Sequence, residues 1–418
     1  MRNPLTRRRT AGLAALAAAS LALTGCGNGL SKGNDNGAAS SEKGHVKLRM
    51  LIASSGDAET KAVNDAVAVW EKKTGNQVTV TPAQDMTTEL SKTFASSKPY
   101  DLMYIDAGRF ATYADIGALY AYGDKAAQAG DVYPALKDTF TYDNKFYCMP
   151  KDSSTLALEI NKDMWAKAGL TDADIPTTWD QLHAVAKKLT TGTTVGLSMG
   201  ATRDRVGAFM VQAGGWPVSA DSSKATADTP ENLQALQFLQ SMLEDGSMKW
   251  SSDLDTGWGG EAFGTKKAAM TIEGNWISGA MTADYPDVKY TTAELPAGPK
   301  GKGTLAFTQC WGVAAKSKAQ AQAIDLINAL TTDKQQLENA QAFGVMPSLQ
   351  TDRAPYLAQF PQNKAFLAGT EYAHGPISLP NFDPVLADFD SKLAGLKTGD
   401  PKAILASLQK NASAALAK

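Results

Sequence analysis

The stretch VKLRMLIASSGDAETKAVNDAVAVWEKKTGNQVTVTP, residues 46–82, decides the fold class. Its first eight residues are largely apolar and predict a strand, which the polar turn SSGD ends. Apolar residues then recur at helical spacing from Ala62 to Trp70, which predicts a helix over 58–73 that stops at Gly75. QVTVTP predicts the next strand. This order of strand, helix and strand indicates an α/β sheet with helices on its faces.

The same alternation continues beyond residue 82. A helix is predicted near 87–97, a strand at YDLMYID (100–106) and a helix over 109–119. Ligands collect beyond the carboxyl ends of parallel strands, which here are the turns at 54–57 and 106–109. Asp57 and Arg109 are therefore candidate ligand residues, although Asp57 could instead cap its helix and Arg109 could be a solvated surface charge.

A second lobe is expected to begin after NKFYCMPKDSSTLALEINKDMW, residues 144–165. Thr178-Trp179-Asp180-Gln181 has the pattern of a capping box that opens a helix to Leu189, and Thr229-Pro230 opens another helix to Glu244. Further helices are predicted near 318–330, 333–342, 384–396 and 401–416.

The N-terminus has the layout of an export signal. Four arginines precede an apolar, alanine-rich run from Ala11 to Leu23, which is too short to span a bilayer. The run ends in Leu23-Thr24-Gly25-Cys26, which resembles a bacterial lipobox. We therefore expect residues 1–25 to be a signal peptide, Cys26 to carry lipid and residues 26–45 to be a tether. A secretory signal that happens to contain a cysteine is the alternative, and the arginine cluster leaves twin-arginine export open.

Composition narrows the class of protein. The chain has 418 residues, 43% of them hydrophobic and 20% charged, which is typical of a globular protein with room for two cores. Without the four arginines of residues 1–25, 37 Lys and Arg remain against 43 Asp and Glu, a net charge of −6. This balance argues against nucleic acid as a partner. Cys148 and Cys310 either form a disulfide, which would contribute on the order of 4 kcal/mol, or stay as two buried thiols.

Several stretches, in this order, are similar to the extracellular solute-binding proteins of ABC sugar importers, the maltose-binding-protein-like group. They are VWEKKTGNQVTVTP (69–82), PYDLMYIDAGRFATYADIGALYAY (99–122), NKFYCMPKDSSTLALEINKDMWAKAGL (144–170), IPTTWDQLHAVAKKLT (175–190), FGTKKAAMTIEGNW (263–276) and CWGVAAKS to FGVMPS (310–348). Their order and spacing carry the resemblance, which extends over nearly all of the chain after Cys26.

The resemblance implies a two-lobe α/β fold of the periplasmic-binding-protein type, with a hinge of crossing segments near 150–155, 306–311 and 346–351. Lobe I would comprise 46–152 and 312–348, and lobe II 153–311 and 349–418. A disulfide between Cys148 and Cys310 would then pin two hinge strands together. The expected protein is a monomer without cofactor, held outside the cytoplasm by lipid on the bacterial cell membrane. It is expected to capture a carbohydrate, in particular an oligosaccharide, between its lobes and to deliver it to the permease subunits of an ATP-driven importer.

The resemblance also implies where the ligand contacts lie. A sugar offers hydroxyls at its rim and an apolar C–H face, so its binder needs carboxylates, amides and flat aromatic rings. Several tryptophans stand beside glycines or in turns, and Trp276, after the Gly-Asn break of AAMTIEGNW, matches an aromatic platform of the family. Gly108 stands where the maltose binder has a contacting acid, so Asp106 would take over. The candidate ligand residues are Ser55, Asp57, Asp106, Arg109, Asp152, Ser153, Ser154, Trp216, Trp258, Asn275, Trp276 and Trp311.

Enzymatic readings have weaker support in the sequence. Gly196-Leu197-Ser198-Met199-Gly200 fits the G-x-S-x-G pattern of serine hydrolases, with His374 as the only histidine downstream, but no oxyanion motif accompanies it. The three histidines are scattered, so no metal site is expected. Paired carboxylates for glycoside hydrolysis could be imagined at Asp57, Asp106 and Asp152, although they suit sugar hydroxyls equally well. Among binding proteins, a polyamine binder is the alternative, because acids and aromatic rings also suit a cationic amine.

Overall fold

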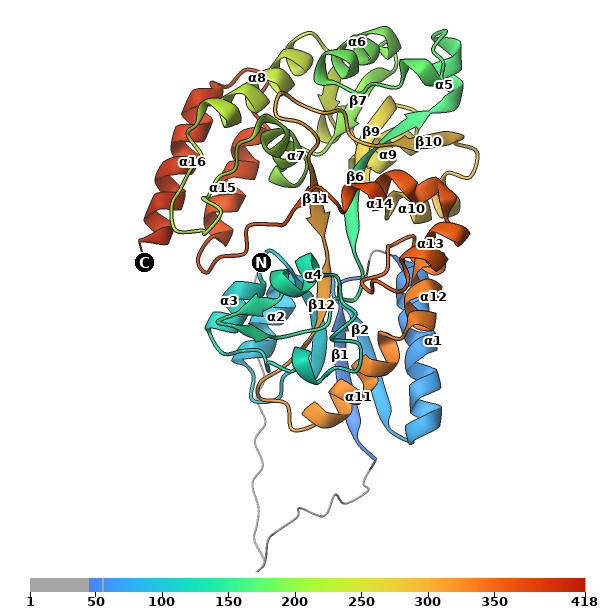
Figure 1. Cartoon of the computed structure of the whole chain (residues 1–418), viewed down its shortest axis with the longest axis vertical. Coiled ribbons are helices and arrows are strands. Elements are labelled where there is room, and N and C mark those ends of the chain that lie inside the picture. The colour runs from blue at the N-terminus through green and yellow to red at the C-terminus, as the bar shows by residue number, and fades with distance from the viewer. Residues whose placement is uncertain (1–44, 55, 418) are drawn as a thin grey trace, which may run out of the picture. The chain divides into compact units, whose positions relative to one another are not determined.

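The computed structural model describes residues 45–54 and 56–417, which form one compact unit from His45 onwards. The predicted signal peptide, Cys26, most of the tether and Ser55 lie outside the described residues. Within the described part, two sheets form the centres of two lobes that the chain joins by three crossing segments (Figure 1).

The first sheet has the strand order β12-β3-β1-β2. Its strands are β1 (Lys47–Ile52), β2 (Gln77–Pro82), β3 (Leu102–Asp106) and β12 (Gln309–Val313); β1 runs parallel to β2 and β3, and β12 runs antiparallel to β3. The apolar run of β3 is buried on both faces, whereas β2 lies at the sheet edge and alternates between exposed and half-buried residues. The predicted strand-helix-strand order is therefore confirmed, with β2 at the expected bounds.

Six helices belong to this part of the chain: α1 (Asp57–Thr74), α2 (Met86–Ala95), α3 (Phe110–Asp115), α4 (Pro134–Thr139), α11 (Gln320–Leu330) and α12 (Asp333–Phe343). A short hairpin joins β4 (Thr141–Tyr142) to β5 (Lys145–Phe146), and a 3-10 turn covers Gly123–Lys125. Helix α3 ends at Asp115, four residues before the predicted end, because the chain turns through Gly117 at a positive φ of 66°. The largest side chains of the lobe I core are Trp70, Trp311 and the tyrosines Tyr104, Tyr113 and Tyr122.

The second sheet has the strand order β13-β11-β6-β9-β7-β8, and β10 also pairs with β6. Its strands are β6 (Ser154–Asn161), β7 (Val195–Met199), β8 (Met248–Trp250), β9 (Ala268–Gly274), β10 (Tyr290–Ala293), β11 (Thr304–Phe307) and β13 (Ala373–His374). Strand β6 is buried along its whole length, which fits its position inside the sheet.

Ten helices accompany the second sheet or follow it in sequence: α5 (Lys162–Lys167), α6 (Trp179–Leu189), α7 (Arg203–Ala213), α8 (Pro230–Glu244), α9 (Gly259–Gly264), α10 (Ile277–Asp284), α13 (Arg353–Gln359), α14 (Lys364–Gly369), α15 (Asp383–Leu393) and α16 (Pro401–Leu416). The predicted capping box of α6 forms only in part: the Thr178 hydroxyl accepts from Gln181 N, but the Gln181 side chain accepts from Thr177 N. Short 3-10 turns lie at Asp172–Asp174, Ser251–Leu254 and Pro361–Asn363.

Three segments cross between the sheets and hydrogen-bond to one another. Lys151 N donates to Gln309 O over 2.8 Å, and Ser153 and Met346 exchange two backbone hydrogen bonds of 2.8 and 3.0 Å. Thr308 alone separates β11 of the second sheet from β12 of the first. The chain thus enters the first sheet at Gln309, three residues before the lobe boundary at 312 that the resemblance implied.

A disulfide joins Cys148 to Cys310, whose Cα atoms lie 5.7 Å apart. Both cysteines are buried, and the adjoining Pro150 and Cys310 form an antiparallel bridge. The covalent link therefore ties two of the crossing segments together beside the first sheet. It closes the chain over 162 positions, and constraint of so long a loop disfavours the unfolded state.

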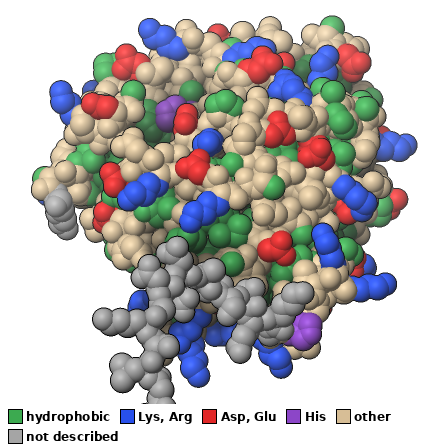
Figure 2. Space-filling view, turned by 60° about the horizontal axis from the view of Figure 1, so that its bottom comes forward, with side chains coloured by type: hydrophobic (Ala, Val, Ile, Leu, Met, Phe, Trp, Pro, Cys, Tyr) green, Lys and Arg blue, Asp and Glu red, His purple; other side chains and the backbone are tan. Residues whose placement is uncertain are grey.

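Charged side chains are spread over the surface. On the face drawn in Figure 2, acidic and basic side chains are interspersed rather than gathered by sign over most of the area. None of the helices among residues 45–54 and 56–417 is both long enough and apolar enough to cross a bilayer.

Candidate functional site

A cavity of about 90 Å³, here called the inner chamber, lies where the two sheets meet the crossing segments. Lobe I contributes the turn that follows β3, and lobe II contributes the start of α7, the turn after it and the loop before α15. Its lining includes Asp106, Ala107, Gly108, Arg203, Asp204, Met210, Trp216, Phe307, Thr308, Pro376 and Ile377. The chamber is therefore built from both lobes and from the crossing strand between them.

Asp106 is the lobe I carboxylate of the inner chamber. It stands at the carboxyl end of β3, and its Oδ1 accepts a hydrogen bond of 2.9 Å from Gly108 N. Desolvation by the surrounding protein raises the pKa of Asp106, although its side chain keeps contact with solvent, and the nearby carboxylate of Asp204 raises it further. The hydrogen bond from Gly108 and the arginines Arg109 and Arg203 oppose the shift. The free lone pairs of this carboxylate can accept from ligand hydroxyls.

Trp216 forms a wall of the chamber from the lobe II side. Its ring lies on α7 at Gly207, where a Cβ would stand 3.3 Å from Cζ3 of the indole. Gly207 therefore gives the indole room to approach the helix closely, and the ring is half-buried with one part against the chamber.

A group of four side chains, here called the cleft cluster, adjoins the chamber: Arg205, Glu273, Trp276 and Phe307. Glu273 Oε2 accepts from Arg205 Nη2 over 2.5 Å and from Trp276 Nε1 over 3.2 Å. The Arg205 guanidinium lies 5.4 Å from the Trp276 ring centroid, and Phe307 meets that ring edge to face at 5.3 Å. One carboxylate thus fixes both the tryptophan and the arginine beside Phe307, which lines the chamber.

A second charged group, here called the hinge cluster, fills the space between α1, β3 and the first crossing segment: Glu59, Tyr104, Lys151 and Asp152. Lys151 Nζ lies 3.0 Å from Glu59 Oε1 and also binds Asp152, and the Tyr104 hydroxyl donates to Glu59 over 3.0 Å. Burial lowers the pKa of Lys151, but the carboxylates of Asp152 and Glu59 outweigh it and raise that pKa above its usual value. Lys151 is therefore a charged, buried link between a lobe I helix and the crossing segment.

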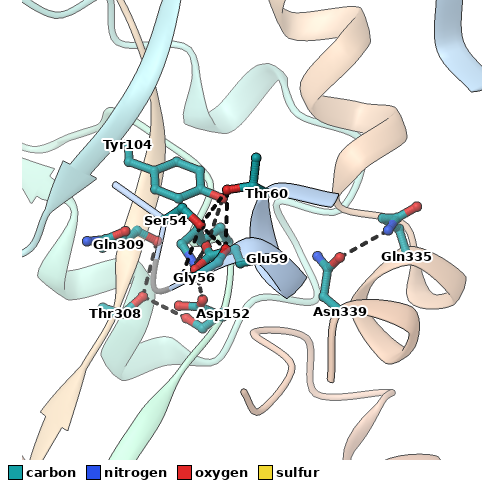
Figure 3. Close-up of polar contacts among 11 residues, drawn as sticks. Ser54, Gly56, Glu59, Thr60, Tyr104, Asp152, Thr308, Gln309, Gln335 and Asn339 are labelled. Carbon is teal, nitrogen blue, oxygen red and sulfur yellow. Dashed lines mark hydrogen bonds and ion pairs between the residues drawn. The ribbon is translucent and has the colours of Figure 1, made fainter. Parts of the chain in front are cut away.

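Figure 3 shows Glu59, Tyr104 and Asp152 of this cluster together with Thr308. The Thr308 hydroxyl, which lines the inner chamber, donates to the backbone carbonyl of Asp152 over 2.7 Å. On the other side, the Thr60 hydroxyl donates to Ser54 Oγ over 2.7 Å at the start of α1. Helix α1 is thus linked to the crossing segment through Glu59 and Lys151, and the crossing segment is linked to the chamber wall through Thr308.

The lobes also touch directly beside the chamber. Arg109 Nε lies 3.5 Å from Asp383 Oδ2, and Ala111 N donates to Ser378 Oγ over 3.2 Å. Arg109 in addition donates to Thr87 on α2. Arg109, expected to bind ligand, therefore has partners on both lobes.

The structure brings some of the residues expected from the sequence together and leaves others apart. Asp106 and Trp216 line the inner chamber, and Trp276 lies next to it through Phe307. Asp152, Ser153, Ser154 and Asn275 are buried around the crossing segments, while Asp57 is exposed at the start of α1. Ser154 Oγ accepts from Asn275 N over 3.2 Å.

Two tryptophans of the expected set pack elsewhere. Trp311 is 2% exposed in the lobe I core, where its ring meets Tyr104 edge to face at 4.8 Å. Trp258 packs against a third core cluster around Phe263 and Tyr356, with its ring over Gly260. Neither residue lines the inner chamber.

Sequence reasoning missed Arg203, Asp204, Arg205, Phe307 and Thr308. The first three stand at the start of α7, which follows β7 after a short turn, so the rule that ligands collect at the carboxyl ends of strands could have found them in lobe II as it found the turn at 106–109 in lobe I. Phe307 and Thr308 carried no such signal, because their position depends on where the chain passes from one sheet to the other.

The alternative chemistry at Ser198 does not match its surroundings. Ser198 lies inside β7, between paired strands on both sides, and its side chain is fully buried. A nucleophile elbow instead places its serine on an exposed turn between a strand and a helix. Among residues 45–54 and 56–417, no group of three or more histidine, cysteine or acidic side chains is placed to hold a metal ion.

Comparisons with known proteins agree with this architecture. The sequence model of bacterial extracellular solute-binding proteins matches residues 65–367. The diacetylchitobiose binding protein of Streptomyces coelicolor is 26% identical over 284 residues, which cover 63% of each chain.

Solved structures resemble the fold over a greater length. An ABC substrate-binding protein from Listeria monocytogenes, solved with cycloalternan, superposes with a TM-score of 0.80 at 22% identity and covers 88% of this chain and 98% of its own. A cyclic maltosyl-maltose binding protein from Arthrobacter globiformis gives a TM-score of 0.77 at 23% identity and covers 89% and 99%. These likenesses confirm the predicted two-lobe fold.

Proposed function

Because the chain belongs to the bacterial extracellular solute-binding protein family, we propose that it captures a carbohydrate between its lobes and delivers it to the permease of an ATP-driven importer. One observation supports a carbohydrate as the ligand. The inner chamber combines a carboxylate, an arginine, a hydroxyl and aromatic rings from both lobes, at Asp106, Arg203, Thr308, Trp216 and Phe307. This is the combination that binds ring hydroxyls at their edges and C–H faces by contact. The named binders of diacetylchitobiose and of cyclic maltosyl-maltose lend further support.

Capture would work by closure. Ligand groups that contact both lobes at once bind the closed arrangement better than an open one, so ligand shifts the population toward closure. Asp106 on one side and Trp216 on the other supply such contacts across the inner chamber. The closed form would then present the surface that the permease recognises.

The rival ligand is a polyamine. Asp106 and Asp204 would favour a cation, but Arg203 beside them would repel it. A thermal-shift screen of neutral mono- and oligosaccharides against putrescine and spermidine decides between them, because a ligand that binds only the folded state raises the apparent melting temperature. We expect a sugar to do so; stabilisation by polyamines alone would overturn the proposal.

Trp276 is the residue that we expect to stack against the sugar. Its ring is half-buried and held by Glu273 next to Phe307. Trp276→Ala should weaken binding of the sugar found in the screen by about 1–3 kcal/mol while the fold stays intact. Calorimetry checks this, with Trp258→Ala as the matched control because Trp258 packs against another cluster. Equal affinities of wild type and Trp276→Ala would return Trp276 to a packing role.

We further propose that the mature chain starts at a lipid-bearing Cys26 and works as a monomer on the outer side of the cell membrane. The support is the sequence pattern around Leu23 to Cys26, which lies outside the described residues. Mass spectrometry of the N-terminal peptide of the protein purified from membranes tests it. A mature chain that begins at any other residue would contradict the proposal.

A further inference from the structure

A larger cavity of about 670 Å³, here called the outer chamber, continues from the inner one. The two share Trp216, Pro376 and Ile377 in their walls. Beyond Trp216, the outer chamber passes between α3 and the β4 hairpin on lobe I and the segment from Trp216 to Glu231 on lobe II. Trp216 therefore stands at the junction between the chambers.

The sizes of the two chambers differ in a way that bears on the ligand. Small-molecule pockets usually enclose about 300–1,000 Å³. The inner chamber, at about 90 Å³, is well below this range, whereas the outer chamber lies within it. A ligand that reaches Asp106 and Phe307 must therefore have most of its bulk beyond Trp216.

Aromatic rings line the path through the outer chamber and are fixed in place. The His374 ring lies 4.1 Å from the Trp216 ring at an angle of 38°, and His374 Nδ1 is 2.7 Å from Gly375 O. Across the chamber, the Tyr142 hydroxyl donates to Asp115 over 2.6 Å, which leaves its ring held at the chamber edge. Rings that are held before the ligand arrives lose little entropy on binding.

The remaining lining is rich in hydroxyls and poor in positive charge. Asp138 and Glu231 are its carboxylates, and no lysine or arginine is among the described residues that line it. Hydroxyl groups come from Thr139, Thr141, Ser219, Ser222, Thr226, Thr229 and Ser378. Such a surface suits uncharged polyhydroxyl groups, and its two carboxylates repel an anionic ligand.

We propose that the outer chamber is a subsite for the further rings of a neutral linear oligosaccharide, of at least three units, whose end enters the inner chamber. This inference rests on the proposed carbohydrate function and adds chain length and charge to it. Tyr142 and His374 contact the added rings, and Trp216 contacts the ligand at the junction. Uronic-acid oligosaccharides are excluded by the acidic lining.

The test measures affinity against chain length. Calorimetric titrations use neutral gluco-, xylo- and chito-oligosaccharides of one to five units, and oligogalacturonides as the acidic series. For wild type we expect at least one neutral series in which affinity rises about tenfold or more from two to four units. Tyr142→Ala and His374→Ala should each reduce affinity for four units about three- to tenfold, and should reduce affinity for two units less.

Tyr120→Ala is the matched control. Tyr120 is also half-buried on lobe I, and its hydroxyl contacts Lys125, away from both chambers. It should alter neither affinity. The subsite proposal would be overturned if wild-type affinity did not depend on chain length, or if affinity rose with length as much in Tyr142→Ala and His374→Ala as in wild type. Oligogalacturonides that bind as tightly as the neutral sugars would overturn it too. Failure of every sugar to bind would instead refute the carbohydrate function itself.

Discussion

The hinge cluster and the cleft cluster contain the same kinds of group in different surroundings. Each holds a cation against carboxylate and beside two aromatic rings: Lys151 lies 4.7 Å from the Tyr104 ring centroid and 5.3 Å from that of Phe343, and Arg205 lies 5.4 Å from Trp276 and 5.9 Å from Phe307. In the hinge cluster all of these rings are buried, whereas Trp276 and Phe307 are half-buried beside the chamber. The hinge cluster therefore serves the fold, and the cleft cluster keeps ring surface available to a ligand.

The two clusters also differ in the residue that supplies the cation, which is lysine in the hinge cluster and arginine in the cleft cluster. A lysine ammonium is a compact charge that can bind several oxygens, and Lys151 binds both Glu59 and Asp152. An arginine guanidinium is planar and can lie over an aromatic ring while it donates to a carboxylate, as Arg205 does with Trp276 and Glu273. A change of the cation should therefore affect the stability of the fold in the hinge cluster and the affinity for ligand in the cleft cluster.

Removal of the buried cation should have the largest effect. Lys151→Met would leave Glu59 and Asp152 buried without that ammonium, and loss of one partner from a buried ion pair costs about 3–5 kcal/mol. We expect the free energy of unfolding, measured by urea denaturation, to fall by about this amount. Lys61→Met on α1 is the control, because the Lys61–Asp65 pair is 75% and 65% exposed and should contribute little. A variant within 1 kcal/mol of wild type would show that the hinge cluster does not stabilise the fold.

Glu159 extends the comparison into lobe II, next to the cleft cluster. The strand register aligns Thr292, Glu159, Thr271 and Ser198 in a row across β10, β6, β9 and β7. The Thr292 hydroxyl donates to Glu159 over 2.8 Å, whereas Glu273 in the same sheet accepts hydrogen bonds from the Arg205 guanidinium and from the Trp276 indole. Burial raises the pKa of Glu159 to about 8, and the nearby Glu273 raises it too, although Thr292 opposes the shift.

The raised pKa of Glu159 predicts that stability falls as pH rises from about 4.5 to about 8. Between its ordinary value of 4.5 and about 8, the folded state holds a proton that the unfolded state has lost, so stability falls as pH rises through this window. The contribution changes by at most about 1.4 kcal/mol per pH unit. Glu159→Gln cannot ionise, so its free energy of unfolding should exceed that of wild type increasingly from pH 5 to 8. Glu244→Gln, at the exposed end of α8, is the control, and parallel pH curves for wild type and Glu159→Gln would contradict the prediction.

The sequence predicted local features of this molecule far better than the two clusters. Strand β2 and helices α8 and α16 have the predicted bounds, because apolar spacing and capping residues such as Thr229-Pro230 act within a few positions. The turn at 106–109 could be found because a strand end is a local feature. The pairs Lys151–Glu59 and Arg205–Glu273 join residues 92 and 68 positions apart, and no local pattern specifies which distant carboxylate a cation meets. For the same reason Trp311 and Trp276 could not be separated into core and cleft by their glycine-rich neighbours.

A change of cation without loss of charge should have the smallest effect and sharpen the comparison most. Arg205→Lys keeps the positive charge beside Glu273 but removes the planar group over Trp276 and Phe307, a contact that contributes on the order of 1 kcal/mol. We expect a two- to fivefold loss of affinity for the sugar found in the thermal-shift screen, measured by calorimetry, with stability changed by less than about 1 kcal/mol. Arg353→Lys, in an exposed pair with Glu371, is the control and should change neither quantity. Unchanged affinity in Arg205→Lys would mean that only the charge matters in the cleft cluster, and the distinction between the two clusters would then reduce to burial alone.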